Sequence, residues 1–202
     1  SEVAYEMPLL SKRPFFMFVS QSGETADLIS VIKKCIELKI PNLAITNAPL
    51  SSIDNLADAV MHLHANKEIS VASTKAYLAQ VVTFSILARA VVMKKTSLKQ
   101  NLNNLALAIE DILSKKEEIK AVAERFVEAK DAFYIGRGLS YYACLEATLK
   151  LKEIAYIHTE GYASGELKHG PIALIEPGTP VIAIIADEST NAITRSNLIE
   201  TK

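Results

Sequence analysis

The stretch FFMFVSQSGET, residues 15–25, contains the feature that decides the fold: a short apolar run that ends in a small polar turn. The run is continuously apolar rather than alternating, which is typical of a parallel strand covered on both faces. After the turn the apolar positions change to helical spacing, with Leu28, Ile32, Cys35 and Ile36 on one face. The stretch therefore predicts a strand, a tight turn and a helix, in that order.

Similar apolar runs recur along the chain and alternate with helical patterns. The runs are Phe15–Val19, Leu43–Thr46, Val60–Leu63, Ala132–Ile135 and Val181–Ala186. Helices are predicted over residues 25–38, 74–95, 98–113, 115–130 and 140–155, and the second is apolar enough to be largely buried. Residues 50–135 contain neither glycine nor proline, so most of this stretch should be helical. This alternation predicts two α/β units with parallel sheets, joined by a helical bridge.

Composition excludes several classes of protein. The 202 residues include 22 Lys and Arg against 23 Asp and Glu, so the chain lacks the excess of cations on which binding to nucleic acid by bulk charge depends. No apolar run approaches the roughly 20 residues of a membrane span, and the acidic, mixed N-terminus SEVAYEMPLL is not a secretory signal. Cys35 and Cys144 lack CxxC spacing. We therefore expect no disulfide framework, no zinc–thiolate site and a reducing cytoplasm as the setting.

The polar turn is suited to an anion. Ser20, Ser22 and Thr25 supply hydroxyls and Gln21 an amide, at the point where the next helix would direct its free N–H groups. Gly23 would let the backbone approach a ligand closely. Three or four charge-assisted hydrogen bonds of roughly 1.5–3 kcal/mol each suffice for a phosphate monoester. The alternative is that Ser22 merely caps the helix, with Thr25 completing a weak capping box.

The second half of the chain contains candidates for acid–base chemistry. Glu146, Lys150 and Glu153 are spaced i, i+4, i+7 and so line one face of the predicted 140–155 helix. The row is either a solvated salt-bridge stripe or a partly buried set in which a carboxylate could act as a base. His169 lies in a loop bounded by glycines and a proline, where a histidine is commonly just exposed.

Three further sites have mainly structural interpretations. Ser73 precedes a helical run and would suit an N-cap. His62 and His64 share one face of a strand-like run, but no further metal ligands are evident and no metal is expected. Residues 136–138, Gly-Arg-Gly, lie at a second strand-to-helix turn without the serine cluster, so this turn is interpreted as a structural copy of the first.

Three motifs resemble a known family. SQSGETAD (residues 20–27) is similar to the phosphosugar-binding signature of SIS domains. Together with VASTKA (71–76) and LKLKEIAYIHTEGYASGELKHGP (149–171), it resembles the isomerase half of the glucosamine-6-phosphate synthase family, the glutamine–fructose-6-phosphate aminotransferases, over essentially the whole chain. The resemblance implies tandem SIS domains, each a parallel sheet flanked by helices in a flavodoxin-like three-layer arrangement. The implied organisation is a first domain over 1–96, a helical linker over 97–130 and a second domain over 131–202, truncated at both ends.

The resemblance also implies an activity and roles for residues. The activity is conversion of fructose 6-phosphate and glutamine-derived ammonia to glucosamine 6-phosphate for hexosamine biosynthesis. Glu153 would move the proton between C1 and C2, Lys150 would stabilise charge on the sugar oxygens, and His169, donated across a homodimer interface, would open the sugar ring. The residues implied to bind the substrate are Ser20, Gln21, Ser22, Thr25, Ser73 and the backbone of Val71. No cofactor, nucleic acid or membrane partner is expected.

The sequence departs from the family pattern at both ends. The family's N-terminal glutaminase domain is absent from these residues and is expected in the full-length chain, and the family's Schiff-base lysine would lie beyond Lys202. The 202 residues alone are therefore expected to be inactive. Two alternatives remain: an SIS-type amino-sugar-phosphate deaminase or deglycase, and a sugar-phosphate sensor that performs no chemistry.

Overall fold

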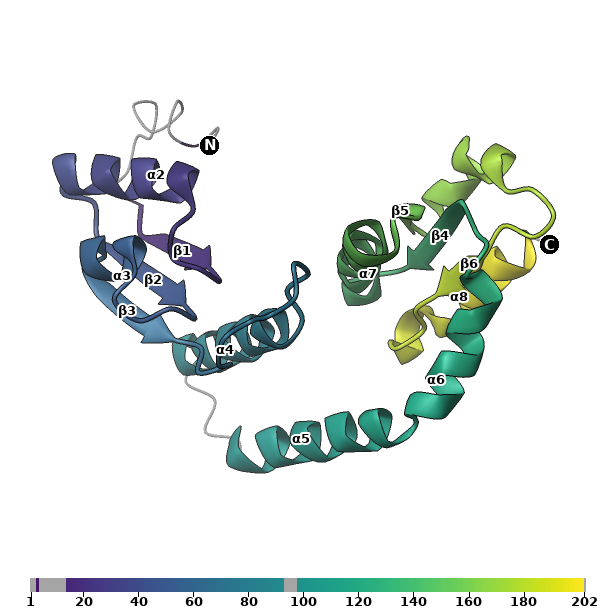
Figure 1. Cartoon of the computed structure of the whole chain (residues 1–202), viewed down its shortest axis with the longest axis horizontal. Helices are drawn as coiled ribbons and strands as arrows, with labels where there is room; N and C mark the ends of the chain where they lie inside the picture. The colour runs from purple at the N-terminus through teal and green to yellow at the C-terminus, as the bar shows by residue number, and fades with distance from the viewer. Residues whose placement is uncertain (1–2, 4–13, 93–97, 202) are drawn as a thin grey trace. The chain divides into compact units, whose positions relative to one another are not determined.

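The structure is a computed structural model that describes residue 3, residues 14–92 and residues 98–201. The chain divides into two compact units, residues 1–98 and 99–202, whose helices and strands are labelled in Figure 1. Each unit contains a three-stranded parallel sheet, so the predicted α/β class with parallel strands is confirmed. Within the described ranges, no helix combines the length and apolar character that a membrane crossing requires.

The first unit has the sheet order β1-β2-β3. Its strands are β1 (Phe16–Ser20), β2 (Asn42–Thr46) and β3 (Ala59–His62), and its helices are α2 (Ala26–Glu37), α3 (Ser52–Leu56) and α4 (Lys75–Val91). The register places Phe18 opposite Ala44, and Ala44 opposite Val60. Since all three strands run the same way, the segments that leave them, including the polar turn after β1, meet at one edge of the sheet.

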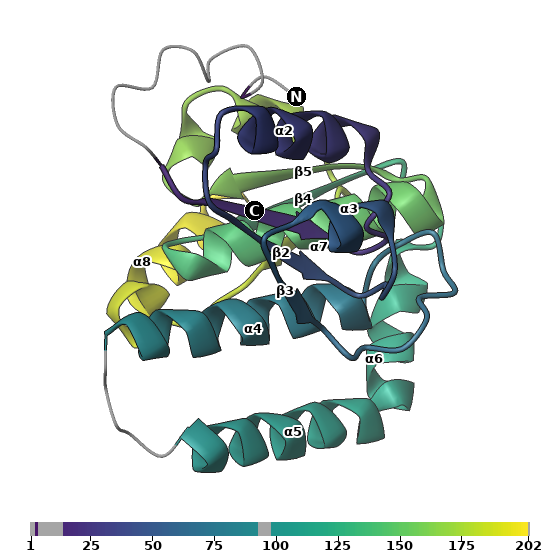
Figure 2. The same ribbon diagram turned by 90° about the vertical axis from the view of Figure 1, so that its left-hand side faces the viewer.

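The core of the first unit lies between the sheet and α2. Phe18 and Ala44 on the strands pack with Ile32 and Cys35 on α2, and Ile53 of α3 closes the same cluster. Figure 2 shows α2 running alongside β1. The apolar face predicted for the 25–38 helix is confirmed in part: Ile32 and Cys35 have no exposed surface, but Ile36 is 46% exposed and Val31 is buried in its place.

The prediction that the 74–95 helix is largely buried is wrong. It forms α4, but of its described side chains only Ala76 is buried. Leu78, Val81 and Phe84 are all more than one-third exposed, and Val91 is 82% exposed. Apolar residues occupy most of the circumference of α4, and the described part of this chain supplies too little surface to cover them.

The second unit begins with two helices and continues into a sheet of order β5-β4-β6. The helices α5 (Leu98–Ser114) and α6 (Lys116–Ala123) lead through the 3₁₀ turn η2 (Glu124–Phe126) into β4 (Asp131–Gly136). There follow α7 (Leu139–Ala155), β5 (His158–Ala163), the 3₁₀ turns η3 (Glu166–Lys168) and η4 (Pro171–Leu174), β6 (Val181–Ala183) and α8 (Glu188–Ile199). The predicted 115–130 helix thus ends early, and residues 127–130 are not helical.

The core of the second unit lies around β4 and α7. Phe133 and Ile135 on β4 are buried, and Cys144 and Thr148 on α7 lie against β5 at Gly161. A β-carbon at Gly136 would lie 2.7 Å from the backbone of Ser140, so glycine at this position lets α7 start close to the end of β4. Neither cysteine of the chain forms a disulfide, and both are buried.

Gly23 in the polar turn provides a test of the fold. Its φ is +67°, and a β-carbon there would lie 1.9 Å from Ser51 Oγ. Gly23→Ala should therefore carry both a left-handed backbone penalty of about 1–2 kcal/mol and an overpacking penalty of about 1–3 kcal/mol. Gly178→Ala is the matched control, because φ is +94° there and nothing lies within 4 Å. Denaturant unfolding of the full-length protein should show a clearly larger decrease in the free energy of unfolding for Gly23→Ala than for Gly178→Ala. Equal decreases would contradict the close approach of Gly23 to Ser51.

Candidate active site

The polar turn after β1 is organised by the buried hydroxyl of Ser20. This oxygen accepts a hydrogen bond from the Gly23 N–H at 3.0 Å and shares a second one, also of 3.0 Å, with Thr25 Oγ1. Ser22 is exposed, and its hydroxyl accepts only from the Glu24 N–H at 3.2 Å. The turn thus brings three of the predicted phosphate-binding hydroxyls to the start of α2.

The interpretation of Ser22 as the cap of this helix is wrong. The N-cap of α2 is Thr25, and its side chain makes no capping hydrogen bond. By contrast, the Ser51 side chain caps α3 and the Asp187 side chain caps α8. The first N–H groups of a helix need a partner, and a helix N-terminus attracts anions. The start of α2 is therefore suited to receive an anion from outside the chain.

The turn is also attached to α3. The Glu24 carboxylate accepts hydrogen bonds of 2.7 Å from both the Ser52 N–H and the Ser52 hydroxyl, and these bonds hold the pKa of Glu24 below its ordinary value. The Ile53 N–H donates to the Gly23 carbonyl at 3.0 Å. The negative charge of Glu24 is thereby directed at α3.

A cavity of about 470 Å³ lies at the same edge of the sheet. Gln21 lines it from the end of β1, Asn47 from the end of β2 and His62 from the end of β3. Of the four residues predicted to bind phosphate, only Gln21 contributes to its wall. The cavity adjoins the turn and offers amide and imidazole groups to a polar ligand.

The histidine pair at this cavity does not form a recognisable metal site. His62 Nε2 lies 2.7 Å from Asp54 Oδ1, and the His62 and His64 rings are 6.2 Å apart. A backbone hydrogen bond from Leu50, followed by the bond to His62, holds the pKa of Asp54 below its ordinary value. Among the described residues no three His, Cys, Asp or Glu side chains are grouped as metal ligands.

The segment around Val71 and Ser73 has a capping arrangement that the sequence pattern does not reveal. The cap position of α4 is Thr74, not Ser73. The Glu68 carboxylate occupies the helix start, where it accepts from the Thr74 N–H at 3.2 Å and from the Ala76 N–H at 3.1 Å. The Ser73 hydroxyl is buried and has no hydrogen-bond partner among the described residues. Val71 has 89% of its surface exposed.

The predicted acid–base row on α7 forms a connected ion-pair set. Lys150 Nζ lies 3.1 Å from Glu146 Oε1 and 3.1 Å from Glu153 Oε2. The side chains of Lys150, Glu146 and Glu153 are 21%, 26% and 29% exposed, so the set is partly removed from solvent. Burial acts to lower the pKa of Lys150, but the hydrogen bonds and charges of the two glutamates outweigh it and raise the pKa above its ordinary value. Lys150 is therefore a cation held between two carboxylates.

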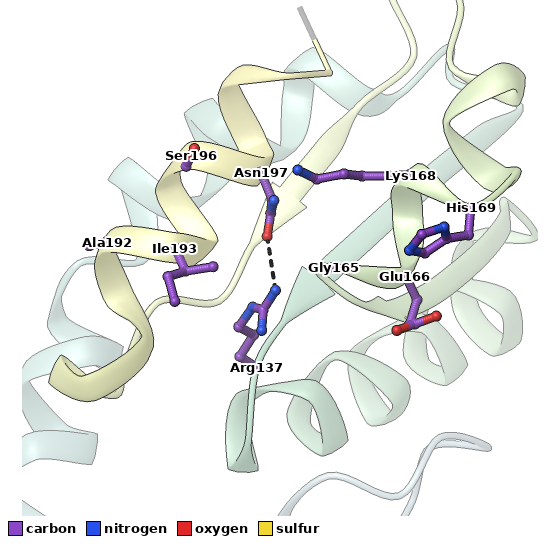
Figure 3. Close-up of a pocket in the computed structure, with 9 residues that line it drawn as sticks. All are labelled: Arg137, Gly165, Glu166, Lys168, His169, Ala192, Ile193, Ser196 and Asn197. Atoms are coloured by element: carbon purple, nitrogen blue, oxygen red, sulfur yellow. Dashed lines mark hydrogen bonds between the residues drawn. The ribbon is translucent and has the colours of Figure 1, made fainter.

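His169 lines a different cavity, of about 600 Å³ (Figure 3). The wall comes from the end of β4, the loop after β5 and one side of α8. It consists of Arg137, Gly165, Glu166, Lys168, His169, Ala192, Ile193, Ser196 and Asn197. The carboxylates of α7 do not line this cavity.

The predicted catalytic residues lie at opposite ends of the second sheet. Glu153 is in the last turn of α7, just before β5 begins at His158, whereas His169 follows the end of β5 at Ala163. A strand rises about 3.3 Å per residue, so β5 separates the two ends by roughly 16 Å. The fold therefore does not bring Glu153 and His169 together within this unit.

Two residues of the His169 cavity, Arg137 and Asn197, and the adjoining Ser164 are not among the predicted site residues. The sequence pattern places Arg137 in a structural turn and gives no role to Ser164 or Asn197. Arg137 Nε donates to Ser164 Oγ at 3.0 Å, and Ser164 Oγ donates to Asn197 Oδ1 at 3.0 Å. The only signal in the sequence is the position of Arg137 directly after a strand, where polar residues commonly meet ligands.

Comparisons with known proteins agree with this geometry. The family model described as SIS domain matches residues 1–90 and 125–202. The isomerizing glutamine–fructose-6-phosphate aminotransferase of Streptococcus pneumoniae is 50% identical over 208 residues, and that of Streptococcus agalactiae is 52% identical over 209 residues. Each match covers 99% of this chain but 35% of the relative, so the chain spans about a third of the length of these curated relatives.

Solved structures also resemble this chain. The C-terminal domain of glucosamine-fructose-6-phosphate aminotransferase from Francisella tularensis superposes with a TM-score of 0.86 at 34% identity, over 98% of this chain and 59% of that one. Glucosamine-6-phosphate deaminase from Thermotoga maritima shares the fold, with a TM-score of 0.72 at 18% identity, over 98% of this chain and 62% of that one. The parallel sheets, the polar turn and the matched residues lead to one conclusion: this chain belongs to the SIS domain family.

Proposed function

We propose that this chain is the sugar-isomerase part of an enzyme that converts fructose 6-phosphate and glutamine-derived ammonia to glucosamine 6-phosphate. The observation that carries the proposal is the start of α2, which lacks a side-chain cap and is surrounded by the hydroxyls of Ser20, Ser22 and Thr25. The names of the relatives at about 50% identity support the choice of substrate. In this proposal residues 1–96 and 131–202 are two SIS domains, residues 97–130 link them, and a glutaminase domain lies elsewhere in the full-length protein.

Binding would depend on the first unit. The 6-phosphate would accept hydrogen bonds from the hydroxyls of Ser20, Ser22 and Thr25, from the Gln21 amide and from the N–H groups at the start of α2. The turn itself contains no lysine or arginine, so within it neutral donors and the helix terminus would stabilise the phosphate, while Lys67 lines the adjoining cavity. The buried hydroxyl of Ser73, which lacks a partner, would gain one from a sugar hydroxyl, and the backbone of Val71 would lie beside it.

The isomerisation would use the row on α7. Glu153 would take a proton from C1 or C2 of the open-chain sugar and return it to the neighbouring carbon. Lys150, held protonated between Glu146 and Glu153, would stabilise the negative charge that develops on the sugar oxygens. Ring opening needs an acid–base group near the ring oxygen, and His169 would supply it.

The placement of these residues supports a site shared between two copies of the chain. Glu153 and His169 lie at opposite ends of the second sheet, so one copy does not present both to the same sugar. We therefore propose a homodimer in which His169 of each copy completes the site of the other. Two unpaired cysteines are in keeping with a reducing cytoplasm as the setting, and hexosamine biosynthesis as the pathway follows from the product.

Removal of a hydroxyl from the polar turn tests phosphate binding. Ser22→Ala or Thr25→Ala in the full-length enzyme should raise KM for fructose 6-phosphate by roughly tenfold each, because one charge-assisted hydrogen bond is lost. Ser30→Ala is the matched control, since Ser30 is an exposed serine on the same helix. Steady-state kinetics at saturating glutamine gives the comparison. An unchanged KM in both variants rules out the turn as the phosphate site.

Replacement of Glu153 tests the proposed base. Glu153→Gln keeps the shape of the side chain and should lower kcat by roughly 10²–10⁴, as expected for loss of a general base. Glu146→Gln is the control, because Glu146 makes an ion pair of the same 3.1 Å length with Lys150 and is similarly exposed. If both variants lose the same activity, the effect comes from the charge beside Lys150 and Glu153 is not the base.

Mixed dimers test the shared site. Copies with Glu153→Gln and copies with His169→Ala should each be inactive alone, and their random mixture should recover about a quarter of wild-type activity. Half of the dimers are then hybrids, and each hybrid has one intact site and one doubly altered site. The measurement is turnover after the two purified variants are dissociated and reassembled together. A mixture as inactive as its components means that both residues act within one copy.

A further inference from the structure

We propose that Arg137, Ser164 and Asn197 act as positioning residues that set the loop bearing His169. This cluster, which we call the clamp, joins the end of β4, the end of β5 and the last turn of α8. Figure 3 shows two of its members, Arg137 and Asn197. Arg137 and Ser164 are 27 residues apart, and Ser164 and Asn197 are 33 apart, so the clamp is made entirely by the tertiary fold. The proposal rests on the proposed function of His169 and adds a mechanism by which it is held.

The hydrogen bonds of the clamp have a consistent direction. Arg137 Nε donates to Ser164 Oγ at 3.0 Å, and that hydroxyl donates onward to Asn197 Oδ1 at 3.0 Å. Arg137 Nη2 also approaches Asn197 Oδ1, at 3.5 Å. A serine hydroxyl has one proton to donate and accepts through its lone pairs, so Ser164 fits between these two neighbours.

Burial makes these hydrogen bonds important. Ser164 has no exposed surface and Asn197 has 5%. A buried polar group that loses its partner pays its full desolvation penalty, which is larger than the net gain from an ordinary hydrogen bond. The arrangement is therefore strongly favoured over one in which α8 or the loop moves away.

The clamp contacts the first residue of the loop directly. A β-carbon at Gly165 would lie 2.6 Å from Arg137 Nη2, so the guanidinium packs against the Gly165 backbone. The Ser164 N–H donates to the Gly136 carbonyl at 2.9 Å, which continues the pairing of β5 with β4 up to the loop. The path of the chain out of β5 is thus determined by Arg137.

A second contact ties the far side of the loop to the same helix. Lys168 Nζ lies 2.7 Å from Glu200 Oε2, just after α8, one turn beyond Asn197. Between these two points Leu167 is buried, with 1% of its surface exposed. The loop is therefore held to α8 before and after Leu167, and His169 follows immediately.

His169 itself contributes little to its own placement. Its side chain is exposed and makes no hydrogen bond or ion pair with the described residues. Its backbone N–H donates to the Glu166 carbonyl at 3.0 Å, within the same loop. The direction of the imidazole therefore depends on where the loop lies, and the clamp determines that position. A misplacement of about 1 Å can cost a catalytic group up to about 10²-fold in rate.

Two substitutions break the clamp and one preserves it. Arg137→Lys keeps the charge but replaces the planar fork by a single ammonium, and Asn197→Leu keeps the approximate volume but removes the acceptor. Asn197→Asp loses the amide donors but retains an oxygen acceptor for both clamp donors, and its new charge lies beside the Arg137 guanidinium, so the clamp should persist. Arg195→Lys, an exposed residue on the same helix that does not line the cavity, is the matched control.

The first measurement is amide hydrogen exchange over residues 164–170 in the full-length enzyme. Arg137→Lys and Asn197→Leu should increase exchange in this loop by about tenfold, while Asn197→Asp and Arg195→Lys leave it unchanged. If Arg137→Lys or Asn197→Leu does not fold, Ser164→Ala, which removes only one hydroxyl, is measured in its place. Unchanged exchange in the loop overturns the clamp, whatever His169 does in catalysis.

The second measurement is a double-mutant cycle with His169→Ala. If the clamp acts through His169, breaking it should lower kcat by about tenfold with little change in KM, and should lower it no further when His169 is already alanine. An equal loss in both backgrounds overturns the positioning role and shows a general structural one. If His169→Ala alone retains full kcat, the proposed function of His169 fails, while the exchange result still decides whether the clamp exists.

Discussion

The need of each helix start for a hydrogen-bond partner is the constraint on which the rest of this structure depends. Each described strand except β5 leads to an α-helix whose first N–H groups have no partner within the helix. In α3 and α8 a side chain at the cap satisfies one of them, and in α4 the carboxylate of Glu68 does so. The start of α2 has no such side chain, and neither does the start of α7 after β4. The two turns differ in the residues beside the uncapped start, since hydroxyl residues surround α2 whereas Arg137 lies just before α7.

The two units share a parallel sheet flanked by helices, but the turns after β1 and β4 contain different residues. In the first, the turn after β1 contains small hydroxyl residues and Gly23, which lies close to Ser51, and the Glu24 carboxylate is bonded to Ser52. In the second, Arg137 fills the corresponding space after β4 and is bonded to Ser164. The sheets also differ, since β1 lies at the edge of the described part of its sheet and β4 at the centre of its own. The two turns are therefore not equivalent places, although their sequences look like a repeat.

Much of the fold could be predicted from local pattern, and most of the rest depends on contacts between distant residues. The apolar runs identify β1, β2, β3, β4 and β6. The prediction that these strands are covered on both faces is wrong for β1, where Met17 is 49% exposed, and for β3 and β6, which contain no buried residue among the described residues. They miss β5, whose sequence HTEGYA is polar and small where α7 packs on Gly161. The apolar composition of α4 predicts more burial than the structure has, since residue type does not reveal whether a covering surface exists. The Arg137–Asn197 contact joins residues 60 apart and leaves no local pattern.

The two buried cysteines give the molecule a useful chemical property. Burial raises the pKa of both the Cys35 and the Cys144 thiol, with the charge of Asp58 adding to the effect at Cys35. The thiolate is the nucleophile, and both cysteine residues are buried, so both thiols should react slowly with alkylating reagents near neutral pH. The two native cysteines should therefore contribute little to labelling by maleimides. A single cysteine introduced on the surface would take up a fluorophore or spin label selectively, without prior removal of the native thiols.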